Sequence, residues 1–367
     1  SAMMPSMKII VTAGGQGTKL WPYSRETKPK QFQPVVGDES LYTDTINALL
    51  QKFTPEDIFV STKRKFIKYI SEQSPQIPLK NYIIEPNAAK DRGPGEGLAF
   101  LRLSIAFPDE PFFLVQADCV RHPADSFLQM IEDAGKLVER DKKYISGGIK
   151  ATEPDLGIDY LQLGERVQND TAQEVYNIEE FLGRKSSYKE TKEIIENFHI
   201  VKHCNHSCWY PGMMLEAYKQ YRPDWYDALM RIKDVLDKPG EDAAIEAIYE
   251  TMEKGATEEV TRHIMEAGEA RIILLPFKWV DIGTWGSVYE FFADGKENYS
   301  DGHVITVDTT GSLIKTSSDK KLIAVAGVQD LVIVDTDDVL LIIPKNKIEK
   351  IKEIQAILNE KDEKEYL

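Results

Sequence analysis

Cysteine is scarce in this chain of 367 residues, which contains only Cys119, Cys204 and Cys208. An odd number spread along a long sequence does not describe a disulfide framework, so we expect a reducing, cytoplasmic location. Long apolar runs are also missing: none approaches the roughly 18 residues that a membrane-spanning helix needs. No charged segment followed by an apolar core stands near the start. We therefore expect neither a membrane partner nor export.

Positive charge is outnumbered, since 45 Lys and Arg face 60 Asp and Glu and give a net charge of −15. Nucleic-acid and anionic-membrane surfaces need clustered basic residues, so we expect no nucleic-acid partner. Local basic pockets for small phosphates stay open. The length is enough for two or three domains with full cores.

What the sequence does contain is a regular alternation of short apolar runs and longer amphipathic stretches. The short runs begin at Met7, Asp57, Asn81 and Phe112, and the helix-like stretches lie at 41–53 and from Gly95. This order predicts an α/β fold, with a Rossmann-like, mostly parallel mixed sheet flanked by helices. Ligands of such sheets bind beyond the carboxyl ends of the strands. The loops after residues 13, 85 and 117 are therefore the candidate binding loops.

The later chain predicts an insertion that covers the substrate, and then a second domain. Strands are expected at 144–149 and twice within 160–180, a charged helix at 188–201, and further helices at 215–222, 225–236, 241–252 and 257–267. After Asn298, short β runs at turn-like spacing predict an all-β domain, either a stack of parallel coils or a small barrel. A helix at 346–359 closes it, and we expect the last eight residues to fray. Because Ser1 and Ala2 look like a remnant of tag removal, we place the domains at 3–297 and 298–367.

The segment 12–32 is rich in glycine and in basic residues. Backbone N–H groups around Gly14, Gly15 and Gly17 can approach phosphate oxygens, because no Cβ intervenes, and the cations that follow can neutralise charge. A tight strand-to-helix turn is the alternative. A P-loop is excluded because no Gly-Lys-Ser/Thr follows, and a dinucleotide fingerprint because Leu20 stands where its third glycine belongs.

The run GGQGTKLWPYSR at 14–25, followed by KPKQF at 28–32, resembles the signature of the sugar-1-phosphate nucleotidyltransferases. It is most similar to that of the mannose-1-phosphate guanylyltransferases, or GDP-mannose pyrophosphorylases. Further matches follow in order at 85–86, 117–118, 212–213, 265–266, 278–285 and 330–345, so the resemblance spans nearly the whole chain. It identifies 3–297 as a catalytic domain and 298–367 as a left-handed β-helix-like domain with a terminal helix.

The resemblance implies transfer of a nucleotidyl group from GTP to mannose 1-phosphate, giving GDP-mannose and pyrophosphate. It implies a Mg²⁺ ion on Asp118 and Asp281. The catalytic residues that it implies are Lys19, Arg25, Lys30, Asp118 and Asp281. The nucleotide-binding residues that it implies are Ala13, Gly14, Gly15, Gly17, Thr18, Glu85, Pro86 and Asp118. The residues implied for the sugar phosphate are Gly157, Glu179, Gly212, Met213 and Glu266.

Several positions depart from the family pattern. Lys19 stands where arginine is usual, Glu180 where a phosphate-binding lysine is expected, and Ala267 replaces another lysine. Two alternatives therefore stay open: a transferase of the same fold that uses another nucleotide or hexose 1-phosphate, and a weakened homologue that binds a nucleotide sugar and regulates. The end of the β domain offers a surface on which a homodimer could form.

The run HCNHSC at 203–208 holds two His and two Cys within six residues. Zinc sites need two such pairs held tetrahedrally, and a second cluster is missing from the sequence. Zinc is one interpretation. The other is an alternating strand that leads into the sugar pocket, with small buried thiols.

Overall fold

The structure, a computed structural model, describes residues 6–15 and 17–367. Two compact units are interleaved along the chain. Unit 1 comprises residues 6–14, 49–116 and 122–278, and unit 2 comprises 15, 17–48, 117–121 and 279–367. From residue 15 on, the described part of the glycine-rich segment therefore shares a compact unit with the C-terminal part of the chain, although it lies close behind the first strand in sequence.

Unit 1 is built on one nine-stranded sheet with the order β3-β2-β1-β4-β9-β6-β10-β8-β7. Its strands are β1 (Lys8–Thr12), β2 (Ile58–Lys63), β3 (Tyr82–Glu85), β4 (Phe112–Gln116), β6 (Tyr144–Lys150), β7 (Tyr160–Arg166), β8 (Val175–Gly183), β9 (Ile200–Trp209) and β10 (Ala270–Leu274). The first four of the order run parallel, and β1 and β4 are buried almost throughout, as their apolar residues predict. The predicted Rossmann-like mixed sheet is confirmed.

The second half of the sheet departs from parallel pairing. β9 runs antiparallel between β4 and β6, while β6 and β10 are parallel. Because β7 pairs with both β8 and β9, the strands β9, β6, β10, β8 and β7 form a closed ring. Long-range pairing of this kind leaves no local signal in a sequence.

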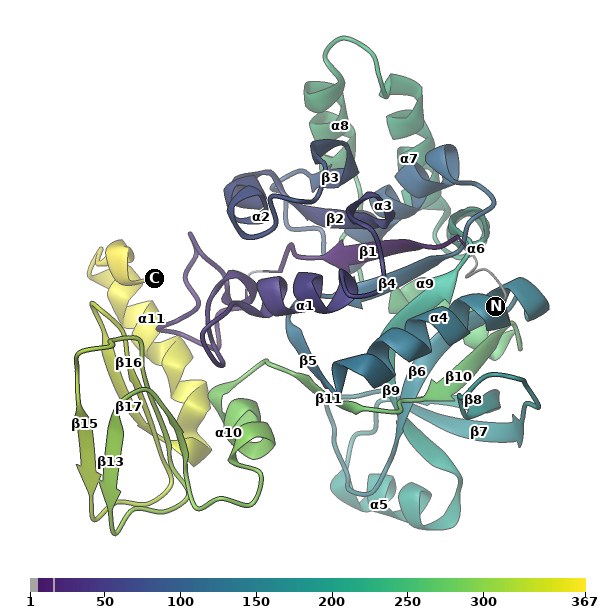
Figure 1. The fold of residues 1–367 in the computed structure, drawn as a ribbon. Helices are drawn as coiled ribbons and strands as arrows, with labels where there is room; N and C mark the ends of the chain where they lie inside the picture. The colour runs from purple at the N-terminus through teal and green to yellow at the C-terminus, as the bar shows by residue number, and fades with distance from the viewer. Residues whose placement is uncertain (1–5, 16) are drawn as a thin grey trace. The chain divides into compact units, whose positions relative to one another are not determined.

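The described part of unit 1 contains eight α-helices. They are α2 (Ile67–Gln73), α3 (Arg92–Ala106), α4 (Ala124–Asp141), α5 (Tyr188–Asn197), α6 (Pro211–Tyr221), α7 (Pro223–Val235), α8 (Glu241–Glu250) and α9 (Glu258–Glu266). In Figure 1, α7 and α8 stand outside the helices that cover the sheet. Helix α3 packs on α6 and α7, and α4 packs on β4, β6 and β9. The helix expected at 188–201 ends at Asn197, because Ile200 and Val201 are buried in β9 instead.

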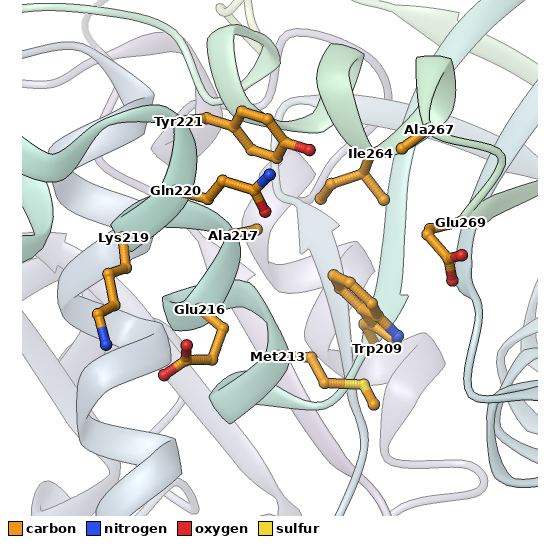
Figure 2. Close-up of a pocket in the computed structure, with 10 residues that line it drawn as sticks. All are labelled: Trp209, Met213, Glu216, Ala217, Lys219, Gln220, Tyr221, Ile264, Ala267 and Glu269. Atoms are coloured by element: carbon orange, nitrogen blue, oxygen red, sulfur yellow. The ribbon is translucent and has the colours of Figure 1, made fainter.

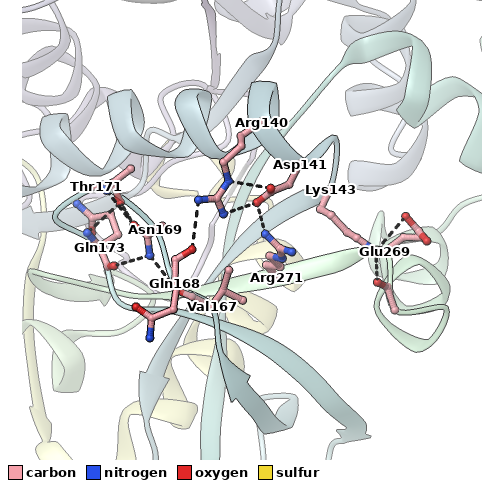
Figure 3. Close-up of polar contacts among 11 residues, drawn as sticks. Arg140, Asp141, Lys143, Val167, Gln168, Asn169, Thr171, Gln173, Glu269 and Arg271 are labelled. Carbon is pink, nitrogen blue, oxygen red and sulfur yellow. Dashed lines mark hydrogen bonds and ion pairs between the residues drawn. The ribbon is translucent and has the colours of Figure 1, made fainter.

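A polar cluster fastens the end of α4 to β10 (Figure 3). The Asp141 carboxylate accepts from Arg140 Nε at 2.8 Å and also from Arg271 of β10. Arg140 in turn donates to the carbonyl of Gln168 at 3.2 Å, in the turn that follows β7. The bond from Arg140, with the Arg271 charge, holds the pKa of Asp141 below its ordinary value.

Unit 2 has its own core, to which the glycine-rich segment contributes from Leu20 on. Its elements are most of α1 (Leu41–Leu49), the paired strands β5 (Cys119–His122) and β11 (Lys278–Asp281), α10 (Trp285–Ala293), β12 (Tyr299–Asp301), β13 (Val304–Val307), β14 (Leu313–Thr316), β15 (Ile323–Ala326), β16 (Leu331–Asp335), β17 (Leu340–Pro344) and α11 (Ile351–Glu360). Leu20 and Trp21 pack in one cluster with Trp285, Val334 and Ile351. Burial of these side chains stabilises the segment as part of the β domain.

The β domain is a stack of parallel coils. β12, β14 and β16 pair in parallel as one sheet, and β13 and β15 as another, while β17 returns antiparallel on β16. Of the two predicted forms, the stack of coils is therefore the correct one. Among the helices of the described residues, none combines the length and the apolar character needed to cross a bilayer.

Candidate active site

Three side chains from distant parts of the sequence meet in unit 2. Lys30 begins the short helix η1 (Lys30–Phe32), Asp118 lies between β4 and β5, and Asp281 ends β11. The Lys30 Nζ lies 3.1 Å from Asp118 Oδ2 and 3.5 Å from Asp281 Oδ1, and it donates to the carbonyl of Ile282 at 2.8 Å. The backbone adds one link, since the Ile282 N–H donates to the Asp118 carbonyl at 3.3 Å.

The two carboxylates respond differently to this shared ammonium. Burial opposes the charge of Lys30, but Asp118 and Asp281 raise the pKa of its ammonium above the ordinary value. Burial also opposes ionisation of Asp118, yet Lys30 holds the pKa of that carboxyl below its usual range. Desolvation of its carboxylate raises the pKa of Asp281, and the negative charge of Asp118 raises it further. Asp118 is therefore the firmly ionised member of the pair.

The glycine-rich segment wraps the stem of Lys30. Gly17 has a φ of +41°, and a Cβ there would lie 2.8 Å from Lys30 Cδ. The Gln31 side chain donates to the Gly15 carbonyl at 2.8 Å. Beyond residue 17, the first helical element after β1 is η1, so a tight strand-to-helix turn does not describe the segment. Glycine at 17 lets the backbone approach a buried lysine that reaches the carboxylates.

The donor set fits a hard divalent cation. Ligand atoms of Asp118, Cys119 and Asp281 lie within 4.8 Å of one another, and this is the one group of three or more such residues found in the described chain. Burial raises the pKa of the Cys119 thiol well above its ordinary value. Sulfur ligands suit soft metals, whereas carboxylates and water suit Mg²⁺. Two carboxylates remain, and Mg²⁺ is commonly bound by one or two carboxylates beside substrate phosphates and waters.

In unit 1, the predicted nucleotide-binding residues Ala13, Gly14, Glu85 and Pro86 lie at the carboxyl ends of β1 and β3. Glu85 is only 9 % exposed, its Oε1 is 3.7 Å from Lys63 Nζ, and burial raises its pKa. A Cβ on Gly95 of α3 would lie 2.6 Å from Glu85 Oε2. Glycine inside a helix lowers its stability, and here it makes room for a buried carboxylate.

The other predicted phosphate contacts lie in unit 2. Thr18 and Lys19 are exposed, and the Lys19 charge acts on the Asp281 carboxyl. Arg25 is turned inward and forms an ion pair with Asp338 at 2.7 Å.

The residues predicted for the sugar phosphate are dispersed over unit 1. Gly157 is exposed between β6 and β7, Glu179 is exposed on β8, and Glu266 ends α9 beside His263. Gly212 and Met213 begin α6, where Met213 lines a pocket of about 440 Å³ with Trp209 and Ala267 (Figure 2).

This pocket lies at the amino-terminal end of the parallel strands, whereas Glu85 lies at their carboxyl end. Trp209 pairs with Phe112, the first residue of β4, whereas Glu85 and Gln116 end their strands. The structure therefore does not bring Gly212 and Met213 to the end of the sheet where Glu85 lies. Their role in binding the sugar phosphate stays a prediction.

A polar cluster that sequence reasoning missed lies near the end of β4. Glu258 pairs with Arg92 and accepts from Asn205 Nδ2 at 2.8 Å, next to a very small cavity that Gln116 also lines. The neighbouring Glu96 accepts from Thr257 Oγ1 at 2.5 Å, and burial raises its pKa to about 7. The available signal was the spacing of Arg92 and Glu96, which lie four residues apart at the start of α3.

The run at 203–208 is an alternating strand. All of it lies in β9, where Cys204 and Cys208 are buried and form no disulfide bond. His203 Nε2 forms a hydrogen bond with Ser146 Oγ at 2.8 Å. Within the described residues this run is not among the metal-ligand groups, so the strand interpretation holds over zinc.

Comparisons with known proteins agree with this architecture. The family model described as nucleotidyl transferase matches residues 8–298, and the one described as MannoseP isomerase/GMP-like beta-helix domain matches residues 302–358. A mannose-1-phosphate guanylyltransferase of Escherichia coli is 30 % identical over 382 residues, covering 97 % of this chain and 76 % of that protein. The alginate biosynthesis protein AlgA of Pseudomonas aeruginosa is 25 % identical, covering 94 % and 70 %.

Among solved structures, one from Thermus thermophilus, described as a mannose-1-phosphate geranyltransferase, superposes with a TM-score of 0.81. It is 24 % identical and covers 96 % of this chain and 99 % of its own. At that identity the similarity supports the fold alone. The fold is thus shared over almost the whole length.

Proposed function

Since the chain belongs to the nucleotidyl transferase family, we propose that it catalyses the mannose-1-phosphate guanylyltransferase reaction, which forms GDP-mannose and pyrophosphate from GTP and mannose 1-phosphate. The observation that carries the proposal is the convergence of Asp118 and Asp281 on Lys30. Metal-assisted phosphoryl chemistry needs carboxylates and cations placed in this way.

In the proposed reaction, an oxygen of the sugar 1-phosphate attacks the α-phosphorus of GTP in line. The bond from that phosphorus to the oxygen bridging the β-phosphate breaks, and pyrophosphate leaves with the electron pair. A Mg²⁺ ion bound by Asp118 and Asp281 would neutralise the charge of the phosphates. Catalysis of this kind depends on positioning and electrostatic stabilisation more than on acid–base groups.

The protein's own groups have separate tasks in this proposal. Lys30 holds the two carboxylates near one point, since its ammonium contacts both. Lys19, exposed and cationic, would stabilise the leaving pyrophosphate, without the bidentate fork that arginine offers. In unit 1, Glu85 would accept from N1–H and the exocyclic amine of guanine. Adenine does not present that pair of donors.

The proposal is tested by pyrophosphate release with GTP, ATP, UTP and dTTP, each combined with mannose 1-phosphate and with glucose 1-phosphate, in the presence of Mg²⁺. We expect the highest kcat/KM for GTP with mannose 1-phosphate. A faster rate with another pair would instead indicate a transferase of different specificity. Tight binding of GDP-mannose without turnover of any pair would indicate a regulatory binding protein, and either result would overturn the proposal.

A further inference from the structure

The guanidinium of Arg25 is committed to its own unit. Its Nη1 and Nη2 donate to the two carboxylate oxygens of Asp338 at 3.1 and 2.7 Å, in a bidentate fork. Its Nε donates to the Pro22 carbonyl at 2.6 Å, and Nη1 also reaches the Glu365 carbonyl at 3.3 Å. The side chain is 14 % exposed. Four hydrogen bonds leave little of the fork to meet a phosphate.

The last residues of the chain complete this contact. The short helix η6 (Lys364–Tyr366) places the Tyr366 carbonyl 2.6 Å from the indole Nε1 of Trp21, which donates to it. The Glu26 N–H donates to the Leu367 carbonyl at 3.3 Å. The expectation that these residues fray is therefore wrong. Their carbonyl groups cap polar hydrogens of the glycine-rich segment that would otherwise need other partners.

The clamped turn leads directly to the candidate active site. Backbone bonds join Arg25 and Lys28 in both directions, at 3.0 and 3.1 Å, so the turn is closed. Lys30 follows two residues later and reaches Asp118 and Asp281. A rotation of the turn would move Lys30, because only one residue separates Lys28 from it.

We propose that Arg25 is a positioning residue: its bonds to Asp338 and to the Glu365 carbonyl clamp the glycine-rich segment onto the β domain and so set the place of Lys30. The bonds that the Trp21 indole and the Glu26 N–H donate to the carbonyls of residues 366 and 367 complete this clamp. This rests on the proposed function as far as catalysis is concerned. The clamp itself does not depend on that function, because it consists of hydrogen bonds within the folded chain. It replaces the role in phosphate binding that the sequence resemblance implied for Arg25.

Asp338→Asn separates the two roles, because it leaves Arg25 present but removes its charged partner. If Arg25 bound phosphate, releasing it from Asp338 would leave kcat unchanged and would lower KM for GTP. The clamp requires the opposite: Asp338→Asn and Arg25→Lys each lower kcat by about tenfold to a hundredfold, the scale of a misplaced reacting group, with KM for GTP within about twofold.

The experiment is a double-mutant cycle with Arg25→Lys, Asp338→Asn and the double variant, on the full chain. Because both substitutions break one contact, the double variant should lose no more kcat than either single one. Glu353→Gln is the matched control. It removes an exposed ion pair with Lys350 at 2.7 Å in the same unit and should leave kcat unchanged.

Backbone hydrogen exchange gives a second readout that needs no activity. Amides of residues 20–28 and 363–367 should exchange faster in both single variants, and at the wild-type rate in Glu353→Gln. Wild-type kcat and wild-type exchange in Asp338→Asn would overturn the clamp, as would additive losses in the cycle. If the wild type turned over no substrate pair, the proposed function would fail, and hydrogen exchange alone would decide on the clamp.

Discussion

Asp281→Asn should separate catalysis from stability. In the proposed reaction this substitution removes one of two oxygen ligands for the divalent ion. Losing one such preorganised electrostatic group typically costs about 10²–10³ in kcat, or about 3–4 kcal/mol of barrier. We therefore expect pyrophosphate release to fall by at least about a hundredfold.

The same substitution should scarcely change folding. The Asp281 side chain is 58 % exposed, so its 3.5 Å contact with Lys30 is worth less than about 1 kcal/mol. Desolvation, with the Asp118 charge, raises the pKa of Asp281 in the folded protein. When the pKa of a carboxyl is higher in the folded than in the unfolded state, the protein becomes less stable as the pH rises through the folded pKa. The charge of Asp281 therefore opposes folding at neutral pH. The neutral amide removes this cost, and the free energy of unfolding should stay level or rise slightly.

Asp118→Asn is the matched control. Lys30 holds the pKa of Asp118 below its usual range, so its charge supports folding above the unfolded pKa and this support is lost in the amide. Initial rates of pyrophosphate release and urea unfolding at pH 7 measure both effects. Both variants should be slow, and only Asp118→Asn should be less stable. A wild-type rate for Asp281→Asn would show that Asp281 takes no part in the mechanism. A large loss of stability in Asp281→Asn would refute the electrostatic reasoning.

Four further predictions concern single sites. Gly95→Ala should raise KM for GTP by about tenfold while kcat stays nearly unchanged, because the added Cβ would lie 2.6 Å from Glu85 Oε2. An unchanged KM in steady-state kinetics would show that Glu85 does not bind the base. Asp141→Asn should lower the free energy of unfolding by about 1–2 kcal/mol at pH 7. Because the pKa of Asp141 is depressed in the folded state, the difference from the wild type should shrink as the pH falls below about 4. A difference that does not depend on pH in urea titrations would contradict this. Lys19→Arg should retain or raise kcat, because a fork replaces a point charge, and a large loss in the same assay would show that the site is built around lysine. Chelation of divalent ions should abolish pyrophosphate release and added Mg²⁺ should restore it, whereas full activity in EDTA would exclude a metal-assisted reaction.

The parts of the fold that local patterns specify were predictable. Apolar, β-branched runs predict β1, β2 and β4, and the order of strands and helices predicts the Rossmann-like half of the sheet. The resemblance also pointed to Lys30, Asp118 and Asp281, and the structure brings these three together. In each case the information lies within a short segment or a motif.

The remaining features depend on contacts between distant residues. The pairing of β7 with β9 closes a ring that no local periodicity encodes. The family resemblance implied a phosphate contact for Arg25, whereas in the folded chain its guanidinium pairs with Asp338, 313 positions away. The cluster of Arg92, Glu96 and Glu258 was missed for the same reason, because charges on two helices are neutralised only in the folded chain.

The most direct test of the metal site is anomalous diffraction from crystals grown with Mn²⁺, a probe that shares the oxygen preference of Mg²⁺. One anomalous peak within about 2.3 Å of carboxylate oxygens of both Asp118 and Asp281 is the predicted result. A peak bound to neither carboxylate, or density at only other acidic side chains, would contradict the account.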